Sequence, residues 1–434
     1  MTHADDAEAV VVVGAGQAGA QTITSLRQGG FDGQITLLGD ESALPYQRPP
    51  LSKAFLAGTL PLDRLHLRPA AFYQQAHVEV MIDTRVTEVD TDKRCARLTD
   101  GRAISFDHLV LATGGRPRQL GCPGADHPRV YYLRTVTDVE RIRSQFHAGK
   151  RLVLVGGGYI GLEIAAVAAA HGLTVTVLEA QSTVLARVTC PTVARFFEDT
   201  HRRAGVTIRC ATTVTCIHDS SSTAHIELDS GEYIEADLVI VGIGLLPNVD
   251  LALAAGLKCE SGIVVDSRCQ TSAPGIYAAG DCTQYPSPIY GRPLHLESVH
   301  NAIEQAKTAA GAILDRDEPF SQVPWFWSDQ YDIKLQTAGV NEGYDDVIIR
   351  GDPSAASFAA FYLKAGKLLA VDAINRPREF MASKALIAEG AEIDPTQLSD
   401  ESVPLTALTA AVTAPAHATL SNDQNLWMSL GEAA

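Results

Sequence analysis

Two short apolar runs, residues 10–13 and residues 152–155, each pass through a glycine-rich turn into a helical stretch. The first segment reads VVVVGAGQAG and the second reads LVLVGGGYIG. A continuous apolar run of this length is typical of a strand buried on both faces of a parallel sheet. The pattern therefore predicts two strand-turn-helix units, with helices beginning near Gln17 and near Leu162.

The three glycines of each turn have the spacing of a phosphate-binding cradle. In such a cradle the first glycine permits a sharp turn, the second lets backbone N–H groups approach a pyrophosphate, and the third lets the helix pack on the strand. The pyrophosphate then lies at the positive end of a helix. The cradle positions are Gly14, Gly16 and Gly19 in the first unit and Gly156, Gly158 and Gly161 in the second.

Each cradle is followed by a second apolar strand that ends at an acidic residue. Asp40 follows residues 35–38, and Glu179 follows residues 175–178. A carboxylate at this point accepts hydrogen bonds from the ribose hydroxyls of a dinucleotide. A single G-x-G-x-x-G turn also occurs as a simple strand-to-helix connection, but two copies with their acids predict two dinucleotide sites.

The pattern after each cradle is also repeated, which indicates an internal duplication. Alternating segments at residues 78–100 and 206–234 predict antiparallel strands, and a buried strand follows each of them, at residues 109–112 and 238–241. Residues 275–281, GIYAAGD, predict one more strand of the first sheet. The strand ends where backbone can approach a ligand are Ala112, Thr113 and Gly114, then Gly242 and Gly244, then Gly280 and Asp281.

From about residue 324 the pattern changes to an aromatic stretch and alternating strands, which predict a smaller α+β domain. The predicted fold class is α/β, with two Rossmann-like nucleotide-binding domains and this third domain. The predicted bounds are residues 1–116 with 248–324 for a discontinuous first domain and 117–247 for the second. Residues 325–415 form the third predicted domain, and residues 416–434 a tail.

Composition narrows the class of protein. The net charge of -16 argues against nucleic acid as a partner, because a phosphate backbone would be repelled. No apolar run has the length of a membrane span, and the acidic start is neither a secretory n-region nor a transit peptide. The eight cysteines are scattered without C-x-x-C, so we expect no metal site and no disulfide framework. The expected location is cytoplasmic.

Seven segments together resemble the FAD-dependent NADH:ferredoxin reductases, the ferredoxin-reductase branch of the pyridine nucleotide-disulfide oxidoreductases. They are YQRPPLSK, VLATGGRPR, GGGYIGLE, VGIGLLPN, AAGDC, PWFWSDQY and NRPREF, and the resemblance extends from about residue 10 to residue 404. It implies FAD in the first cradle, NADH in the second, and electrons that leave one at a time to a [2Fe-2S] ferredoxin. That ferredoxin would serve a cytochrome P450 or a ring-hydroxylating oxygenase, and the resemblance suggests a monomer.

The resemblance also implies individual site residues. Those assigned to FAD, together with the first cradle, are Ala18, Asp40, Arg48, Lys53, Val86, Thr113, Arg134, Asp281, Ser298 and Val299. Those assigned to NADH, together with the second cradle, are Tyr159, Ile160, Glu163, Glu179 and Arg187. Three of the residues carry catalytic expectations, namely Lys53 and Glu163 as an ion pair beside the flavin and Trp327 as an aromatic side chain against its ring.

Two other classes share the double cradle. Flavin-dependent NADH oxidases, peroxidases and disulfide reductases typically need a cysteine near the flavin. In this chain the corresponding segment, residues 44–53, carries Arg48 and Lys53 instead, and no cysteine precedes Lys93. A non-catalytic FAD-binding protein would keep both cradles and be reduced slowly. Taken alone, Lys53 is also compatible with a solvated lysine at a helix start.

Two further expectations concern charge. Relatives usually have Pro or Trp at the position of His300, so we expect this imidazole to titrate near neutral pH and to make the flavin potential pH-dependent. The ferredoxin is expected to bind through a local basic surface, because the chain itself is acidic. The candidates are Lys307, Lys384, Arg64, Arg68 and Arg292, with Gln336 at a position that is basic in relatives and Lys334 beside it.

Overall fold

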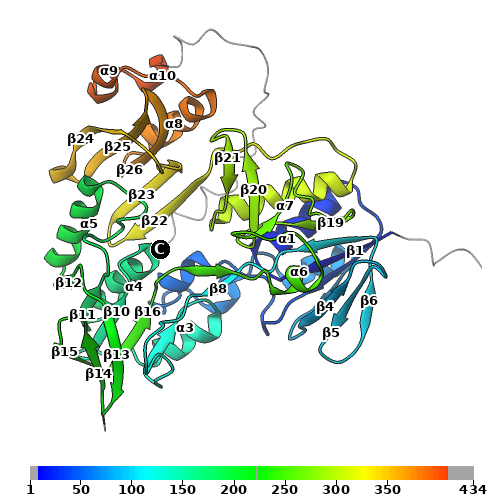
Figure 1. Cartoon of the computed structure of the whole chain (residues 1–434), viewed down its shortest axis with the longest axis horizontal. Helices are drawn as coiled ribbons and strands as arrows, with labels where there is room; N and C mark the ends of the chain where they lie inside the picture. The colour runs from blue at the N-terminus through cyan, green and yellow to red at the C-terminus, as the bar shows by residue number, and fades with distance from the viewer. Residues whose placement is uncertain (1–7, 221, 409–434) are drawn as a thin grey trace, which may run out of the picture.

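The first sheet is five-stranded and parallel, in the order β19-β7-β1-β2-β3 (Figure 1). Its strands are β1 (Ala9–Val13), β2 (Gln34–Leu38), β3 (Val78–Met81), β7 (His108–Leu111) and β19 (Ile276–Ala278). Helices α1 (Gln17–Gln28) and α7 (Val299–Ile313) pack together beside it and share one buried core with β1. The computed structural model describes residues 8–408 except residue 221, so the predicted tail lies outside the described residues.

The second sheet repeats this plan, with five parallel strands in the order β12-β11-β10-β16-β9. Its strands are β10 (Arg151–Val155), β11 (Thr174–Leu178), β12 (Thr207–Arg209), β16 (Leu238–Val241) and β9 (Val130–Tyr132). Its helices are α3 (Val136–Arg143), α4 (Tyr159–Ala170) and α5 (Pro191–Arg203). Helix α4 begins three residues before the predicted start at Leu162, because the cradle leads straight into it after Gly158, as it does after Gly16.

Each parallel sheet is accompanied by a three-stranded antiparallel sheet at the same point of the chain, which confirms the duplication. The first comprises β4 (Val86–Asp90), β5 (Cys95–Leu98) and β6 (Ala103–Ser105). The second comprises β13 (Val214–Asp219), β14 (Ala224–Leu228) and β15 (Tyr233–Ala236). Strands β8 (Gly115–Pro117) and β17 (Leu245–Pro247) pair with each other where the chain crosses between the two halves.

The third sheet is antiparallel, in the order β22-β23-β26-β25-β24. Its strands are β22 (Trp325–Gln330), β23 (Ile333–Gly339), β24 (Asp346–Asp352), β25 (Ser357–Lys364) and β26 (Lys367–Ile374). Helices α8 (Pro377–Glu389), α9 (Pro395–Ser399) and α10 (Leu405–Leu408) follow. One face of β25 packs on α8 through Phe361, and the other packs on α5, where Phe358 and Phe196 stand 5.2 Å apart.

Short elements complete the described chain. They are η1 (Pro49–Ser52), η2 (Leu62–Leu65), α2 (Ala70–Gln75), α6 (Asp250–Ala254), β18 (Ile263–Val264), β20 (Thr283–Ser287), β21 (Arg292–Leu294) and η3 (Pro353–Ala355). The helix start considered for Lys53 is instead the end of a single 3-10 turn, η1, whose last residue is Ser52. Among residues 8–408 no helix combines the length and the apolarity that a membrane crossing needs.

Candidate functional site

One continuous cleft of about 1250 Å³ connects the two cradles. It is bordered by the carboxyl ends of the first and second sheets, by the loop around η1, by the start of α7 and by β22 of the third sheet. Ligands of doubly wound folds bind at the carboxyl ends of parallel strands, so the cleft lies where two dinucleotides are expected. It borders every predicted site residue except Gly19, Gly156 and Gly161.

Those three glycines lie behind the turns and allow close packing. A Cβ on Gly19 would lie 2.0 Å from the carbonyl oxygen of Gly14, and a Cβ on Gly161 would lie 2.3 Å from that of Gly156. Gly156 itself has φ +110°, and its Cβ would lie 2.3 Å from the carbonyl oxygen of Gly242. Only glycine fits at such positions.

The middle glycine of each cradle has the opposite surroundings. A Cβ on Gly16 or Gly158 would meet no described atom within 4 Å, so both positions face open space. Helices α1 and α4 start there without a side-chain cap and without an acidic residue in the first turn. Two uncapped helix N-termini that face open cleft fit the two pyrophosphate groups that FAD and NADH would bring.

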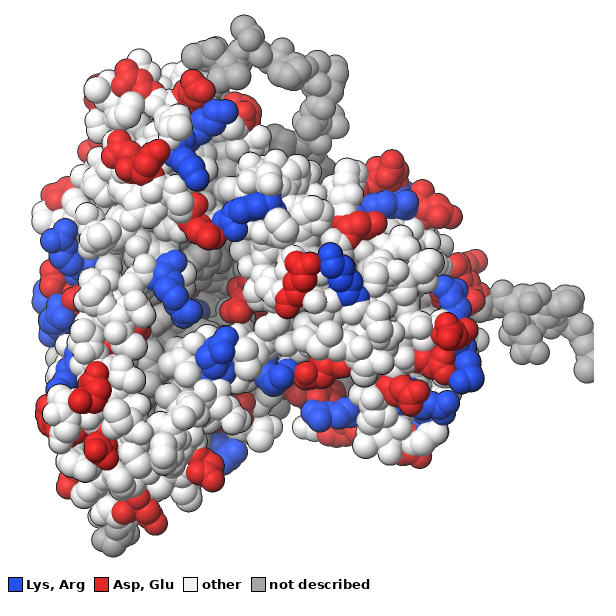
Figure 2. Space-filling view, viewed as in Figure 1, with Lys and Arg blue, Asp and Glu red and all other residues white. Residues whose placement is uncertain are grey.

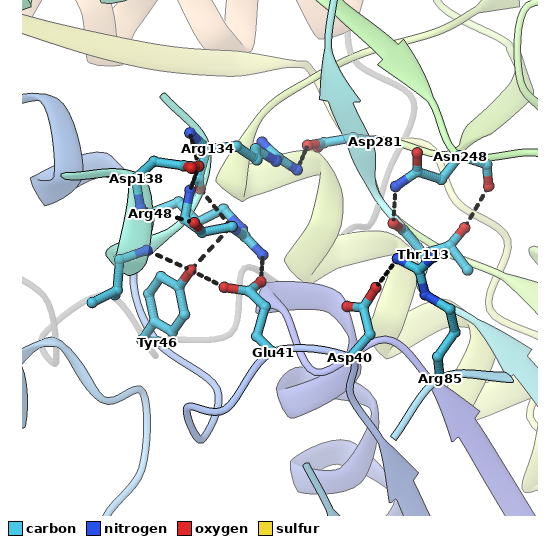
Figure 3. Close-up of polar contacts among 12 residues, drawn as sticks. Asp40, Glu41, Tyr46, Arg48, Arg85, Thr113, Arg134, Asp138, Asn248 and Asp281 are labelled. Atoms are coloured by element: carbon cyan, nitrogen blue, oxygen red, sulfur yellow. Dashed lines mark hydrogen bonds and ion pairs between the residues drawn. The ribbon is translucent and has the colours of Figure 1, made fainter. Parts of the chain in front are cut away.

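The acids that follow the cradles border the cleft, as their spacing predicts. The Glu179 carboxylate accepts hydrogen bonds from the backbone N–H of Gly157 at 2.6 Å and of Gln181 at 2.8 Å. Asp40 forms an exposed ion pair with Arg85 at 3.0 Å (Figure 3). Glu179 is therefore held in a fixed position, whereas Asp40 remains accessible.

A second group of polar contacts joins the η1 loop to the cleft (Figure 3). Arg48 forms an ion pair with Glu41 at 2.6 Å and donates a hydrogen bond to the carbonyl oxygen of Arg134, also at 2.6 Å. Arg134 in turn forms an ion pair with Asp281 at 3.1 Å. Burial lowers the pKa of Arg134, and the neighbouring Arg48 adds to this effect. The contacts bring two predicted cations and the predicted acid Asp281 together.

Several residues that shape the cleft were not predicted from the sequence. Glu41 holds Arg48, and Asn248 exchanges two hydrogen bonds with Thr113 at 2.7 and 2.8 Å. Gln305 on α7 accepts a hydrogen bond from the Gly280 N–H at 2.8 Å and so fixes the turn before Asp281. The pairings of Asn248 and Gln305 join distant parts of the chain and left no local signal, whereas Glu41 was visible only as the second acid beside Asp40.

The predicted ion pair between Lys53 and Glu163 is confirmed, with Nζ and Oε2 2.8 Å apart. Glu163 is 4% exposed and lies on the otherwise apolar helix α4. Two hydroxyl groups also donate to its carboxylate, Ser52 at 2.5 Å and Ser328 at 2.7 Å. The Glu163 carboxylate thus connects the η1 loop of the first half, α4 of the second half and β22 of the C-terminal domain.

Aromatic side chains cover the cleft between Glu163 and the third sheet. Trp327 borders the cleft, as predicted, together with Phe326 and Tyr159, whose rings stand 4.8 Å apart. Flat aromatic surfaces suit a planar ring system such as a flavin or a nicotinamide.

The expectation that His300 titrates near neutral pH is wrong. Burial, together with the positive charges of Lys384 and Lys307, lowers the pKa of His300 to about 3. Its ring packs against Trp325, with centroids 5.3 Å apart. His300 is therefore neutral at physiological pH and does not contribute a charge at the start of α7.

The cysteine next to a predicted site residue is Cys282, which follows Asp281 but is fully buried, with its Sγ 3.5 Å from the carbonyl oxygen of Leu111. None of the described residues that border the cleft is a cysteine, and all eight thiols are free. One cluster in the described part of the chain, Cys216, His218 and Glu227, combines residue types that can bind a metal. It lies on the hairpin β13–β14 outside the cleft, where His218 Nε2 is 2.8 Å from Glu227 Oε2.

Two duplicated dinucleotide folds and a shared cleft with aromatic cover define an oxidoreductase that uses two nucleotide cofactors. Residues 8–306 match the family model of the pyridine nucleotide-disulphide oxidoreductases, and residues 325–409 match that of the reductase C-terminal domain. The chain belongs to this family, in its ferredoxin reductase branch. Members use FAD and a pyridine nucleotide, which the two cradles fit.

The similar proteins cover nearly the whole chain. Putidaredoxin reductase CamA of Pseudomonas putida is 45% identical over 93% of this chain and 97% of its own length. Rhodocoxin reductase of Rhodococcus erythropolis is 41% identical over 90% and 92%. The reductase in the crystal structure of the covalent putidaredoxin reductase–putidaredoxin complex superposes with a TM-score of 0.90 at 44% identity, covering 93% of this chain and 98% of that one.

Proposed function

We propose that the protein takes two electrons from NADH through FAD and passes them one at a time to a [2Fe-2S] ferredoxin. That ferredoxin serves a cytochrome P450 or a ring-hydroxylating oxygenase. The names of the relatives support this proposal, since putidaredoxin reductase and rhodocoxin reductase are each named after the small protein that they reduce.

The observation that carries the proposal is the chemistry of the η1 loop. Disulfide reductases of this superfamily pass electrons through a cysteine pair beside the flavin, but Ser52 and Lys53 occupy the corresponding segment here. No cysteine is found among the described residues that border the cleft. Electrons therefore have no thiol route, and they leave toward a partner at the protein surface.

The two nucleotides are assigned to separate halves of the cleft. The first cradle, Asp40, Arg48, Arg134 and Asp281 would hold FAD, and the second cradle with Glu179 and Arg187 would hold NADH. When bound, FAD accepts a hydride and returns the electrons singly. The chain would bind and orient both nucleotides, and its aromatic residues would offer flat surfaces to their rings.

The Lys53–Glu163 pair lies where it can respond to the nicotinamide. Glu163 is on the helix that begins at the second cradle, and Lys53 follows the loop that carries Arg48 of the first. A contact that draws Glu163 toward one nucleotide therefore changes the position of the lysine charge beside the other. No side chain in this arrangement needs to form a covalent bond with substrate.

The proposed compartment is the cytoplasm. All eight cysteines are free, including Cys190, Cys269 and Cys282, which are buried, and free thiols persist in a reducing environment.

A carrier-exchange experiment tests the proposal. The purified holoenzyme is given NADH with ferricyanide, with oxygen alone, and with a [2Fe-2S] ferredoxin plus cytochrome c. We expect rapid turnover with ferricyanide, slow oxygen consumption, and cytochrome reduction that depends on ferredoxin. Oxygen consumption as fast as ferricyanide reduction would identify an oxidase instead, and slow flavin bleaching by NADH would identify a non-catalytic protein.

A further inference from the structure

A chain of buried side chains joins Glu163 to the protein surface. The Ser328 hydroxyl lies 2.7 Å from Glu163 Oε1, and Gln330 Nε2 lies 3.2 Å from the Ser328 hydroxyl. His201 Nε2 lies 2.8 Å from Gln330 Oε1, and the Tyr331 hydroxyl lies 3.1 Å from His201 Nδ1. Ser328 and Gln330 are each 1% exposed and His201 is fully buried, whereas Tyr331 is 38% exposed.

The direction of every hydrogen bond in this chain follows from the charge at its end. An ionised carboxylate only accepts, so Ser328 donates to Glu163 and must itself accept from Gln330. The amide oxygen of Gln330 then accepts from the Nε2–H of His201. The remaining nitrogen of His201 carries a lone pair and accepts from Tyr331. All the donors thus point toward Glu163.

This order requires a neutral imidazole with its proton on Nε2. Burial lowers the pKa of His201, which keeps the imidazole neutral at physiological pH. A buried polar group left without its partner is unfavourable, so each link constrains the next. The chain is an ordered structure with one consistent set of donors and acceptors.

The backbone at the outer end is strained. Tyr331 occupies the tight turn between β22 and β23 with φ +56°, in the left-handed region that bulky residues rarely adopt. Such a conformation is unfavourable and persists where the surroundings fix it. The contact with His201 supplies this constraint, because the two rings stand 5.0 Å apart and the hydroxyl reaches Nδ1.

We infer that Ser328, Gln330, His201 and Tyr331 are positioning residues that fix the Glu163 carboxylate beside Lys53. These hydrogen bonds run from the turn after β22 to α5, back to β22 and then to Glu163 on α4, so the ion pair depends on how the C-terminal domain packs against the second half. This inference rests on the proposed function in one respect, that the Lys53–Glu163 pair assists hydride transfer from NADH.

The first test compares buried serines of the same domain. In Ser328→Ala, Glu163 loses a donor, and we expect hydride transfer at saturating NADH to slow about tenfold, since small displacements at a reacting site have large effects. Ser328→Thr keeps the hydroxyl and should restore the rate to within about threefold. Ser383→Ala is the control, because Ser383 is also buried but bonds only to the carbonyl oxygen of Glu379.

A second comparison separates positioning from simple loss of stability. If Ser328 acts through Glu163, adding Ser328→Ala to a Glu163→Gln variant should slow the reaction no further, because residues that act as one unit are not additive. Tyr331→Phe removes only the last donor, so it should slow hydride transfer less than Ser328→Ala does while the protein stays folded. Both variants are measured as holoenzyme by stopped-flow bleaching of FAD with NADH.

The outcomes distinguish this inference from the proposed function. Equal rates for Ser328→Ala and Ser383→Ala, or full additivity with Glu163→Gln, would overturn the positioning role. Flavin bleaching does not involve the ferredoxin, so the role can stand even if no ferredoxin is reduced. Failure of ferredoxin reduction in the unaltered protein would overturn the proposed function alone.

Discussion

His300 shows how surroundings decide the charge of a single residue. The side chain faces Trp325, and the nearby cations Lys384 and Lys307 oppose a further positive charge. We therefore predict that the flavin potential has the same pH slope in the unaltered protein and in His300→Pro between pH 6 and pH 8. Redox titrations of the two proteins at several pH values provide the measurement, and a steeper slope in the unaltered protein would mean that the imidazole does titrate.

The same pKa shift predicts an effect on stability. The pKa of His300 is about 3 in the folded protein and about 6.5 in the unfolded chain, so protons bind preferentially to the unfolded chain. The contribution of His300 is then fully present above pH 6.5 and is lost as the pH falls toward 3. Between pH 7 and pH 5 the loss amounts to about 2 kcal/mol. Urea unfolding at pH 7 and pH 5 measures this loss. The free energy of unfolding should fall by about 2 kcal/mol less in His300→Gln than in the unaltered protein, and equal decreases would contradict the lowered pKa of His300.

Glu179 should determine which nucleotide is used. Its carboxylate is held by two backbone N–H groups, so it can accept ribose hydroxyls but cannot move away from a 2'-phosphate. We predict a clear preference for NADH over NADPH. In Glu179→Gln, which removes the charge and keeps the shape, KM for NADPH should fall about tenfold, as loss of a close repulsion implies. Equal or better use of NADPH by the unaltered protein would contradict this interpretation.

The sequence predicted which residues lie near a nucleotide, but it did not predict which side chains form hydrogen bonds with them. Glycine spacing and an acid after a strand are local signals, and the cleft borders Gly16, Gly158, Asp40 and Glu179. The partners of Glu163 are more than a hundred residues away along the chain, and Ser328 has no local feature that distinguishes it. The error at His300 had the same origin, because its neighbours Trp325 and Lys384 come from another domain.

At the scale of one element, the second cradle offers a comparison of two glycines. Gly158→Ala should leave stability unchanged and raise KM for NADH, because a methyl group there meets no described protein atom and points into the space for pyrophosphate. Gly161→Ala should destabilise the protein by about 1–3 kcal/mol, because its methyl group would meet the Gly156 carbonyl oxygen at 2.3 Å. Thermal melts and steady-state kinetics separate the two effects, and a reversed pattern would contradict the cradle geometry.

Element types were easier to predict than element bounds. The apolar strands and the start of α1 at Gln17 appear as expected, because their signals are local. Strand β9 (Val130–Tyr132) was not predicted, since three residues give too short a pattern. Strand β25 was predicted from alternation, yet residues 358–363 are all buried, because α8 covers one face and α5 the other.

At the scale of the whole molecule, duplication built two similar halves and the third sheet connects to both. Figure 1 shows the C-terminal domain beside the second half, and β22 also packs against α7 of the first. Glu163 lies where these parts meet, with partners on η1 and β22. The site is thus formed by all three domains, and a change in how they pack reaches the ion pair directly.

The distribution of charge decides how a ferredoxin can bind. The net charge is -16, and on the face drawn in Figure 2 basic and acidic side chains are interspersed. Long-range attraction to an acidic ferredoxin is therefore unfavourable, and binding depends on local cations. Lys307 and Lys384 both lie close enough to lower the pKa of His300, so they belong to one surface beside the start of α7.

Three of the other candidates already make side-chain contacts of their own. Arg292 is paired with Glu342 at 2.6 Å, and Arg68 lies over the ring of Phe72. Lys384 also lies over an aromatic ring, that of Trp325 at 5.5 Å, so replacing it would disturb packing as well as charge. Lys307 is 52% exposed and paired only with Glu304, three residues before it on the same helix, which makes it the better residue for a test.

We predict that Lys307→Glu weakens ferredoxin-dependent cytochrome reduction several-fold and leaves NADH-to-ferricyanide activity unchanged, because a small oxidant needs no docking surface. Lys93→Glu is the matched control. Lys93 is also exposed and paired with an acid three residues before it, and it follows β4 at the opposite end of the molecule from the C-terminal domain (Figure 1). Added salt should reduce ferredoxin use in the unaltered protein, since screening shortens to about 10 Å at 0.1 M. Added salt should reduce ferredoxin use less in Lys307→Glu, where one attractive contact is already absent. Equal loss of both activities in Lys307→Glu would assign the residue to the fold or the flavin, and equal effects of Lys307→Glu and Lys93→Glu would show that only the net charge matters.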